Sequence, residues 1–163
     1  MKNIKWIGSP NTSPRGRHKP IAIVLHIMDG TLKGTDSWFL SPKSQVSAHY
    51  GIGKDGEIHQ YVKEDMVAWA NGRVQKPTWP LIATGPNPNL YTLSIEHEGK
   101  PGETFTDAMY DSTTWLIREM SQRWGIPLDR EHIIGHCEIF AAKPNCPGNG
   151  LDWSGLLSKL KVT

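Results

Sequence analysis

The amino-acid sequence predicts an α/β fold, a single domain in which a central mixed β-sheet is flanked by helices. Residues 21–28 read IAIVLHIM and are apolar at both parities, which is typical of a strand buried on both faces. Residues 45–62 contain two alternating segments around a Lys-Asp-Gly turn, the pattern of a β-hairpin. Residues 106–124 carry apolar side chains at helical spacing. Strand and helix patterns alternate along the chain, which favours this fold class. The length of 163 residues is enough for one substantial core.

The first residues of the chain precede any regular element. Residues 1–19 are polar and rich in turn formers, so we expect an extended arm. In the strand 21–28 that follows, His26 shares a face with Ala22 and Val24. A neutral histidine there is either a metal ligand or a hydrogen-bonded core residue, and the strand alone favours neither.

A short helix and the hairpin come next. Residues 35–40 (TDSWFL) predict the helix, with Thr35 or Asp36 as its cap. In the hairpin, His49 shares the polar face with Ser47. His49 is therefore either a hydrogen-bonding group of a site or an ordinary polar-face histidine.

The middle of the chain predicts loops followed by a strand. Residues 66–72 (MVAWANG) are rich in small side chains and indicate a loop. Residues 73–89 are proline-rich and lack periodicity, and a connection of this length suggests a functional loop at the edge of a cleft. Residues 90–98 (LYTLSIEHE) alternate as a strand, which places Glu96 on the polar face, well suited to a cleft.

The helix 106–124 has a signal at each end. Thr104 or Thr106 can cap its start, and Gly125 ends it. Its apolar stripe is best explained by packing against the sheet. Two short elements complete the prediction, a buried strand at 133–135 and a terminal helix at 153–160.

The segment after residue 133 combines two metal-ligand side chains in an irregular loop. His136 is followed ten residues later by Cys146, and His26 is the best third candidate. Two neutral imidazoles and one thiolate would hold zinc with an open position for water, as in catalytic sites. The spacing matches no zinc finger, and no HExxH motif is present, so the three are alternatively unrelated core or surface residues.

Charge and hydropathy limit the partners. The formal charge of +2 and the lack of a Lys/Arg block argue against nucleic acid. No apolar run approaches membrane-spanning length, and the N-terminal residues lack the apolar core of a signal peptide. Cys137 and Cys146 form no disulfide framework, and a bridge between them would remove the proposed thiolate ligand. We therefore expect synthesis in the cytoplasm, with any delivery elsewhere by another factor.

Five motifs follow one another along most of the chain. They are IVLH at 23–26, QVSAHYGIGKDGEIHQYV at 45–62, AWANG at 68–72, LSIEHEG at 93–99 and IIGHCEI…NCPG at 133–148. In this order they resemble the zinc-dependent type-2 N-acetylmuramoyl-L-alanine amidase family, which includes phage endolysins and peptidoglycan recognition proteins. Each motif is weak alone, but the ordered set is highly specific.

The resemblance implies a fold, a cofactor and a substrate. Residues 1–163 would form one amidase catalytic domain, a central mixed sheet flanked by helices with a single zinc ion on the cleft side of the sheet. The partner would be bacterial peptidoglycan, and the bond cleaved would be the amide between the lactyl group of muramic acid and L-alanine. We expect a monomer that meets neither nucleic acid nor membrane.

Roles for individual residues follow from their motif positions. The resemblance implies that His26, His136 and Cys146 are the zinc ligands. Glu96 would be the catalytic carboxylate that takes a proton from water and returns it to the leaving amine. His49 of the SAHY segment would line the site.

The sequence departs from the family pattern beside the last ligand. Many active relatives carry a lysine two residues before the cysteine, where its ammonium meets the developing oxyanion. Pro144 holds that position here, and Lys143 stands three residues before Cys146. The oxyanion role therefore passes either to Lys143, whose side chain is long and flexible, or to another donor such as His49. A second departure is Met28, where the family often has a small polar residue.

Three functions are compatible with these motifs. A zinc amidase acting as a phage or prophage endolysin is the favoured one, ahead of a bacterial autolysin or recycling amidase. A catalytically silent peptidoglycan-binding module would typically have lost a zinc ligand, whereas all three are present. A structural zinc domain would need a fourth protein ligand.

Overall fold

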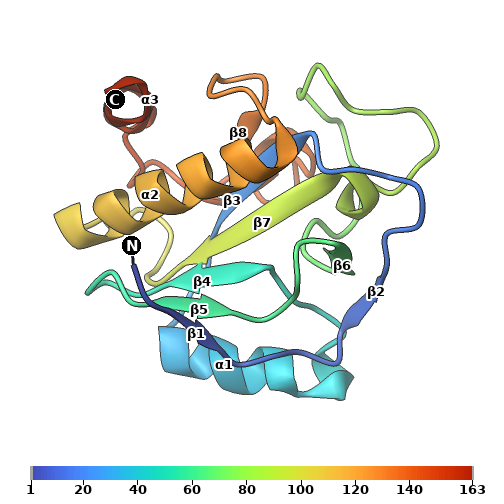
Figure 1. The fold of residues 1–163 in the computed structure, drawn as a ribbon, viewed down its shortest axis with the longest axis horizontal. Coiled ribbons are helices and arrows are strands. Elements are labelled where there is room, and N and C mark those ends of the chain that lie inside the picture. The colour runs from blue at the N-terminus through green and yellow to red at the C-terminus, as the bar shows by residue number, and fades with distance from the viewer. Residues whose placement is uncertain (1, 163) are drawn as a thin grey trace.

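Strand β3 (Ala22–Ile27) is the strand next to one edge of a six-stranded sheet, and all of its residues are buried. The computed structural model describes residues 2–162 and orders the sheet β1-β5-β4-β7-β3-β8 (Figure 1). A separate two-stranded sheet joins β2 and β6. The remaining strands are β1 (Ile4–Trp6), β2 (Thr12–Pro14), β4 (Tyr50–Ile52), β5 (Ile58–Gln60), β6 (Met66–Ala68), β7 (Thr92–His97) and β8 (Ile133–Gly135).

The main sheet is mixed. β3 pairs in parallel with β7 and β8, β4 pairs in parallel with β7, and β1 pairs in parallel with β5. Only the hairpin β4–β5 is antiparallel within this sheet. The β3–β7 register sets His26 opposite Glu96, so the two side chains emerge side by side on the same face.

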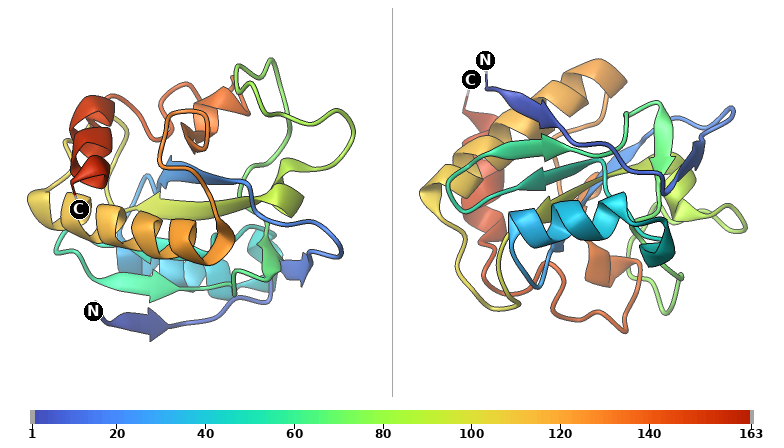
Figure 2. Two further views of the ribbon diagram at one scale, coloured as in Figure 1. Left: turned by 45° about the horizontal axis from the view of Figure 1, so that its top comes forward. Right: turned by 90° about the horizontal axis from the view of Figure 1, so that it is seen from below.

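Residues 2–162 form three α-helices, α1 (Leu32–Leu40), α2 (Asp107–Trp124) and α3 (Trp153–Lys161). α2 lies across one face of the sheet and α1 lies on the opposite face (Figure 2). Apolar side chains of α2, including Leu116 and Ile117, join those of β3 and β7 in the largest core cluster. α3 packs against α2. None of the helices within residues 2–162 is long and apolar enough to cross a membrane.

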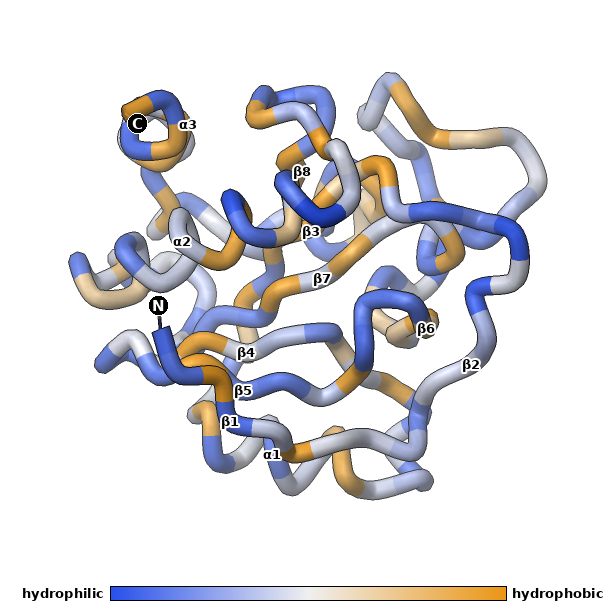
Figure 3. Tube along the Cα trace, viewed as in Figure 1, coloured by the Kyte–Doolittle hydropathy of each residue, from blue (hydrophilic) through white to orange (hydrophobic). Residues whose placement is uncertain are grey.

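Hydropathy follows this layering. In Figure 3 the hydrophobic residues gather on the central strands, while the peripheral connections are largely hydrophilic. The side chains of Ile23 and Leu25 on β3 face α2, and His26 faces the side that α1 covers only in part. The sheet therefore has one sealed apolar face and one face on which a polar site can form.

The predicted fold class is confirmed, and so are most of the predicted elements. Strand β3, the hairpin β4–β5, strand β7, helix α2, strand β8 and helix α3 all form at the expected places. α2 is capped by Thr106, whose side chain accepts a hydrogen bond from the Met109 backbone, and it ends at Gly125, whose φ of 69° is left-handed. The proline-rich segment is irregular until a 3₁₀ helix, η2 (Pro88–Tyr91).

Three expectations for the first half of the chain were wrong. The arm of residues 1–19 is not free of regular structure, because it contains β1 and β2. The segment 66–72 is not only a loop, because β6 pairs with β2. α1 begins at Leu32 rather than near residue 35, since Thr31 accepts a hydrogen bond from the Gly34 backbone and caps the helix.

Candidate metal centre

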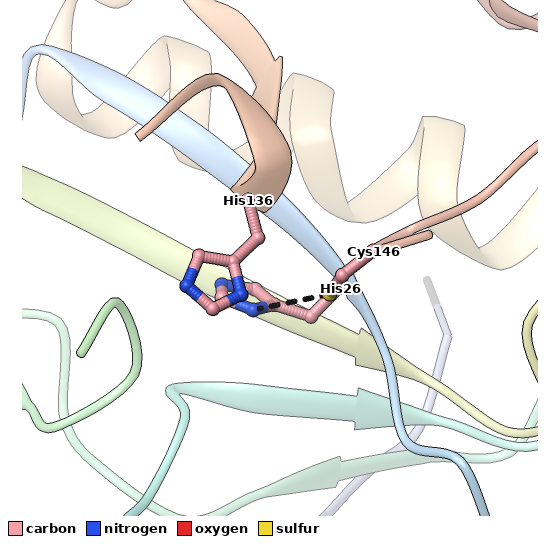
Figure 4. A group of neighbouring side chains, drawn as sticks. All are labelled: His26, His136 and Cys146. Carbon is pink, nitrogen blue, oxygen red and sulfur yellow. Dashed lines mark hydrogen bonds between the residues drawn. The ribbon is translucent and has the colours of Figure 1, made fainter. Parts of the chain in front are cut away.

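Three side chains of metal-ligand type converge at the end of β3 (Figure 4). One ligand atom each from His26, His136 and Cys146 lies within 4.8 Å of the others. His26 Nδ1 is 3.8 Å from Cys146 Sγ, and the two imidazole centroids are 4.5 Å apart. Over residues 2–162 this is the one such group of three or more His, Cys, Asp or Glu side chains. The structure therefore brings the three predicted ligands together.

Backbone pairing explains the convergence. β8 pairs with β3 up to Leu25 and Gly135, so the 3₁₀ turn η3 (His136–Glu138) delivers His136 beside His26. The chain then loops out and returns, and the Cys137 amide donates to the Cys146 carbonyl at 2.9 Å. The Ile27 amide also donates to Cys146 Sγ at 3.5 Å. The thiol is thus fixed to the same strand that carries the first histidine.

Burial sets the protonation of the three groups. The exposed fractions of His26, His136 and Cys146 are only 1%, 7% and 8%. Burial lowers the pKa of His26 well below its ordinary value, and it also lowers the pKa of His136. Burial raises the pKa of the Cys146 thiol to about 12. Both imidazoles are therefore neutral with a free lone pair, and the thiol needs a nearby cation to ionise.

This donor set fits zinc. Two imidazole nitrogens and one thiolate are typical zinc ligands, and tetrahedral zinc spaces its nitrogen and sulfur ligands by about 3.6 Å. The separation of 3.8 Å between His26 Nδ1 and Cys146 Sγ agrees with that value. With three protein ligands one coordination position stays open, as catalytic zinc requires.

Glu96 lies next to these groups without being one of them. Its Oε1 is 3.9 Å from His26 Nδ1, and its Oε2 is buried without a hydrogen-bond partner. Burial raises the pKa of Glu96 to about 8, although the positive charge of Lys143 opposes this shift. A carboxyl group that titrates near neutrality beside a cleft can act as a general acid or base.

Lys143 is exposed and lies close to the same groups. Two successive turns fold the loop back, because the Lys143 amide donates to the Phe140 carbonyl at 2.9 Å and the Cys146 amide donates to the Lys143 carbonyl at 3.1 Å. Beside the larger effect of burial, its charge influences the pKa of Glu96, of His136 and of Cys146. The predicted lysine is thus within electrostatic reach of the site.

His49 is not brought to the site. Its ring is 1% exposed and is not among the residues lining the cleft. The Ser94 amide donates to His49 Nδ1 at 3.1 Å, and Nε2 donates to the Met66 carbonyl at 3.1 Å. Burial, and then the adjacent Arg15 charge, lower the pKa of His49 to about 3. The structure therefore places His49 in a buried hydrogen-bond network outside the cleft lining.

A cleft of about 600 Å³ opens above the metal-ligand cluster. α1 contributes Trp38 to one wall, the segment after β6 contributes Trp69, and the loop after β8 contributes Phe140. Trp38 is 58% exposed. Exposed indole faces offer a flat apolar platform of the kind that sugar rings pack against.

Two supporting residues escaped the sequence analysis. His97 is fully buried, its Nδ1 lies 2.9 Å from the His26 carbonyl, and its Nε2 lies 2.9 Å from Thr113 Oγ1. Asn71 is also fully buried, and its carbonyl accepts a hydrogen bond from His136 Nε2 at 2.9 Å. Their only sequence signals were membership of the LSIEHEG and AWANG motifs.

The buried state of His49 predicts acid lability. Its pKa is about 3 in the folded protein and about 6.5 when unfolded, so the unfolded state binds one more proton between these values. The stabilisation is complete above pH 6.5 and is lost as the pH falls toward 3, at up to about 1.4 kcal/mol per pH unit. The free energy of unfolding can be measured with urea, in the presence of a chelator, at several pH values between 7 and 4. It should fall less steeply with decreasing pH for His49→Gln than for the wild-type protein. Equal slopes in the two proteins would contradict this account.

Comparison with known proteins agrees with the site. The family model of N-acetylmuramoyl-L-alanine amidase matches residues 16–149. N-acetylmuramoyl-L-alanine amidase A of Achromobacter lyticus is 35% identical over 108 residues, covering 64% of this chain and 53% of that protein. The 1,6-anhydro-N-acetylmuramyl-L-alanine amidase AmpD of Haemophilus influenzae is 32% identical over 117 residues, covering 72% of this chain and 60% of that protein.

A solved structure extends the likeness to the whole fold. The crystal structure of the selenomethionine derivative of AmpD superposes with a TM-score of 0.82 at 25% identity, covering 99% of this chain and 96% of that chain. The sequence matches to curated relatives are shorter, since this chain spans about half of the Achromobacter protein. With a family model that matches most of its length, the chain belongs to the N-acetylmuramoyl-L-alanine amidase family.

Proposed function

We propose that this protein is a zinc-dependent amidase that hydrolyses the bond between N-acetylmuramic acid and L-alanine in peptidoglycan. The observation that carries the proposal is the convergence of His26, His136 and Cys146 beside Glu96 at the floor of the cleft. Family membership supplies the substrate class. Zinc held by these three side chains would supply Lewis-acid chemistry, which makes water more acidic and an amide carbonyl more electrophilic.

Glu96 has the properties of the proton carrier. Its unpartnered Oε2 is free to accept a hydrogen bond, and its carboxyl lies beside the ligand cluster. The same burial that raises its pKa increases its affinity for a proton. It can therefore take a proton from the attacking water and return it to the leaving amine.

Lys143 is the best candidate for stabilising the negative charge on the carbonyl oxygen. Its side chain lines the cleft, and its charge acts on Glu96 and Cys146. The turns that enclose residues 140–146 return the chain to Cys146, and Lys143 lies within them although it is one residue earlier than in many relatives. An ammonium in this position would favour an oxyanion more than the neutral ground state.

Two substrate forms distinguish the biological settings. Action on the intact wall, as in a phage or prophage endolysin that reaches it after release or export by another factor, is the setting that we favour from the sequence. The Haemophilus relative is named for a 1,6-anhydro-N-acetylmuramyl substrate, which supports a soluble muropeptide as the second candidate. Relative rates on purified walls and on anhydro-muropeptides would separate the two, and a binding module would cleave neither.

Zinc content and activity should depend together on Cys146. We expect one zinc per chain, loss of peptide release from purified cell walls after chelation, and recovery on adding zinc. Cys146→Ser should lose both the metal and the activity, because a serine hydroxyl replaces the thiolate ligand. Cys137→Ser is the matched control, since Cys137 is half-buried and lies outside the ligand group. An unchanged zinc content and an unchanged activity in Cys146→Ser would contradict the proposed ligand set.

Removing the charge of Glu96 should impair chemistry and leave the metal in place. Glu96→Gln keeps the shape of the side chain but cannot carry the proton, so kcat should fall by about 10²–10⁴. Glu98→Gln is a suitable control, since Glu98 follows on the same face and accepts from the Lys54 amide, a contact that glutamine can retain. Metal analysis accompanies the kinetics, and a zinc-free Glu96→Gln protein would identify Glu96 as a ligand instead.

The oxyanion role of Lys143 predicts a kinetic loss without loss of zinc. Lys143→Ala should lower kcat by about 10²–10³, the usual effect of removing one oxyanion donor. Lys43→Ala, in the turn η1 (Pro42–Ser44) after α1, removes the same charge at an exposed position outside the cleft lining. This control therefore reports any general electrostatic effect on an extended substrate. A loss below about threefold in Lys143→Ala would exclude Lys143 from the mechanism.

A further inference from the structure

Asn71 lies behind both histidines of the metal-ligand cluster. It is 0% exposed and occupies the loop that follows β6. We propose that Asn71 is the positioning residue of this site, and that it holds His26 and His136 in the tautomer that leaves Nδ1 of each ring free to bind metal. The inference rests on the proposed zinc site and identifies what orients its ligands.

The backbone of Asn71 fixes His136. Its carbonyl oxygen is 2.9 Å from His136 Nε2, and a carbonyl can only accept a hydrogen bond. The ring proton of neutral His136 therefore resides on Nε2. Its Nδ1 keeps the lone pair that a metal needs.

The side chain of Asn71 fixes His26. Since His26 Nδ1 faces Cys146 Sγ at 3.8 Å, metal binding there requires the ring proton to be on Nε2. Among residues 2–162, His26 Nε2 and Asn71 Oδ1 are both buried without a hydrogen-bond partner. Burial lowers the pKa of His26, whereas a hydrogen bond with the Asn71 side chain raises it, which is the effect of an acceptor. Asn71 Oδ1 is thus the neighbouring acceptor for the His26 N–H, and the two unpaired buried atoms are complementary.

Neighbouring bonds prevent the Asn71 amide from turning round. The Thr92 hydroxyl donates to the Pro88 carbonyl at 2.9 Å, so its oxygen is left to accept from Asn71 Nδ2, also at 2.9 Å. The Asn71 backbone amide donates to Asn89 Oδ1 at 2.9 Å and holds the residue in place. A flipped amide would present NH₂ to the His26 N–H and oxygen to the Thr92 oxygen, losing both contacts.

In this arrangement a single residue, Asn71, orients two histidine rings. Hydrogen bonds to the ring nitrogen opposite the metal set the tautomer and the orientation of a histidine ligand. Here one residue faces both rings: the backbone carbonyl of Asn71 accepts from His136, and its side-chain oxygen is the acceptor available to His26. A change in the side chain should therefore affect His26 and spare His136.

The test compares the two histidines within one variant. In zinc-free wild-type protein, ¹⁵N NMR of the imidazoles above pH 7.5 should show the Nε2–H tautomer at both rings. Asn71→Leu removes the side-chain acceptor and keeps the backbone carbonyl, so His26 should lose this tautomer while His136 retains it. Zinc affinity, measured by competition with a chelator, should weaken by about 10–100-fold, the usual effect of losing such a partner.

Two further variants separate positioning from simple stability. Asn71→Asp keeps an oxygen acceptor and should hold His26 in the Nε2–H form with zinc affinity restored. Asn11→Leu makes the same change at another buried amide, one that bonds Ser44 Oγ and the Val46 carbonyl, and should lower stability while leaving tautomers and zinc affinity unchanged. An equal loss of zinc affinity in Asn11→Leu would overturn the proposal.

The remaining outcomes are equally decisive. The proposal is wrong if Asn71→Leu keeps the Nε2–H tautomer at His26 and binds zinc within threefold of wild type. If that variant does not fold, Thr92→Val, which frees the Asn71 amide to turn, must give a mixture of His26 tautomers, and an unchanged tautomer would refute the proposal. The tautomers are measured without zinc or substrate. A failure of the proposal for Asn71 is therefore distinguishable from a failure of the proposed amidase function.

Discussion

The parallel pairing of β3 with β7 is the constraint on which the site depends. It places His26 beside Glu96, and its hydrogen bonds leave no freedom to shift one side chain relative to the other. A slip of β3 by one residue would turn His26 into the apolar layer against α2 and leave Glu96 on the opposite face. The first candidate metal ligand and the proposed proton carrier are therefore fixed by the same strand pairing. Cys146 is tied to this strand as well, through the Ile27 amide.

Burial then gives the groups their chemistry. Low solvation keeps His26 and His136 neutral, raises the pKa of Cys146 to about 12 and raises that of Glu96 to about 8. Each of these shifts removes charge from a site with few partners. A bound divalent cation would compensate the negative charges of the Cys146 thiolate and the Glu96 carboxylate together. Binding such a cation must release the thiol proton, so affinity for metal should rise with pH.

Sequence reasoning succeeded where the signal is local. The apolar run of β3 and the helical spacing of α2 predict their elements without reference to other segments. The motifs also named three side chains that the structure brings within 4.8 Å of one another. It failed for β1, β2 and β6, which have three residues each and are defined by pairing with distant partners. His49 illustrates the same limit, because alternation placed it on a polar face, whereas Arg15 from the N-terminal arm fills the space beside it.

That N-terminal arm has a structural role that the sequence concealed. The Arg15 guanidinium is 3% exposed, donates to the carbonyls of Leu90 and Thr92, and donates to the Met66 carbonyl at 2.6 Å. It thereby joins the start of β7 to β6, which β2 also pairs. The loop that leaves β6 carries Asn71, whose carbonyl oxygen is hydrogen-bonded to His136 Nε2. Arg15 also donates to the carbonyl of Asn89, a residue that lines the cleft, so the N-terminal segment supports the elements around the candidate metal centre. These bonds give a structural reason for a buried arginine in a segment that the sequence alone predicts to be an extended arm.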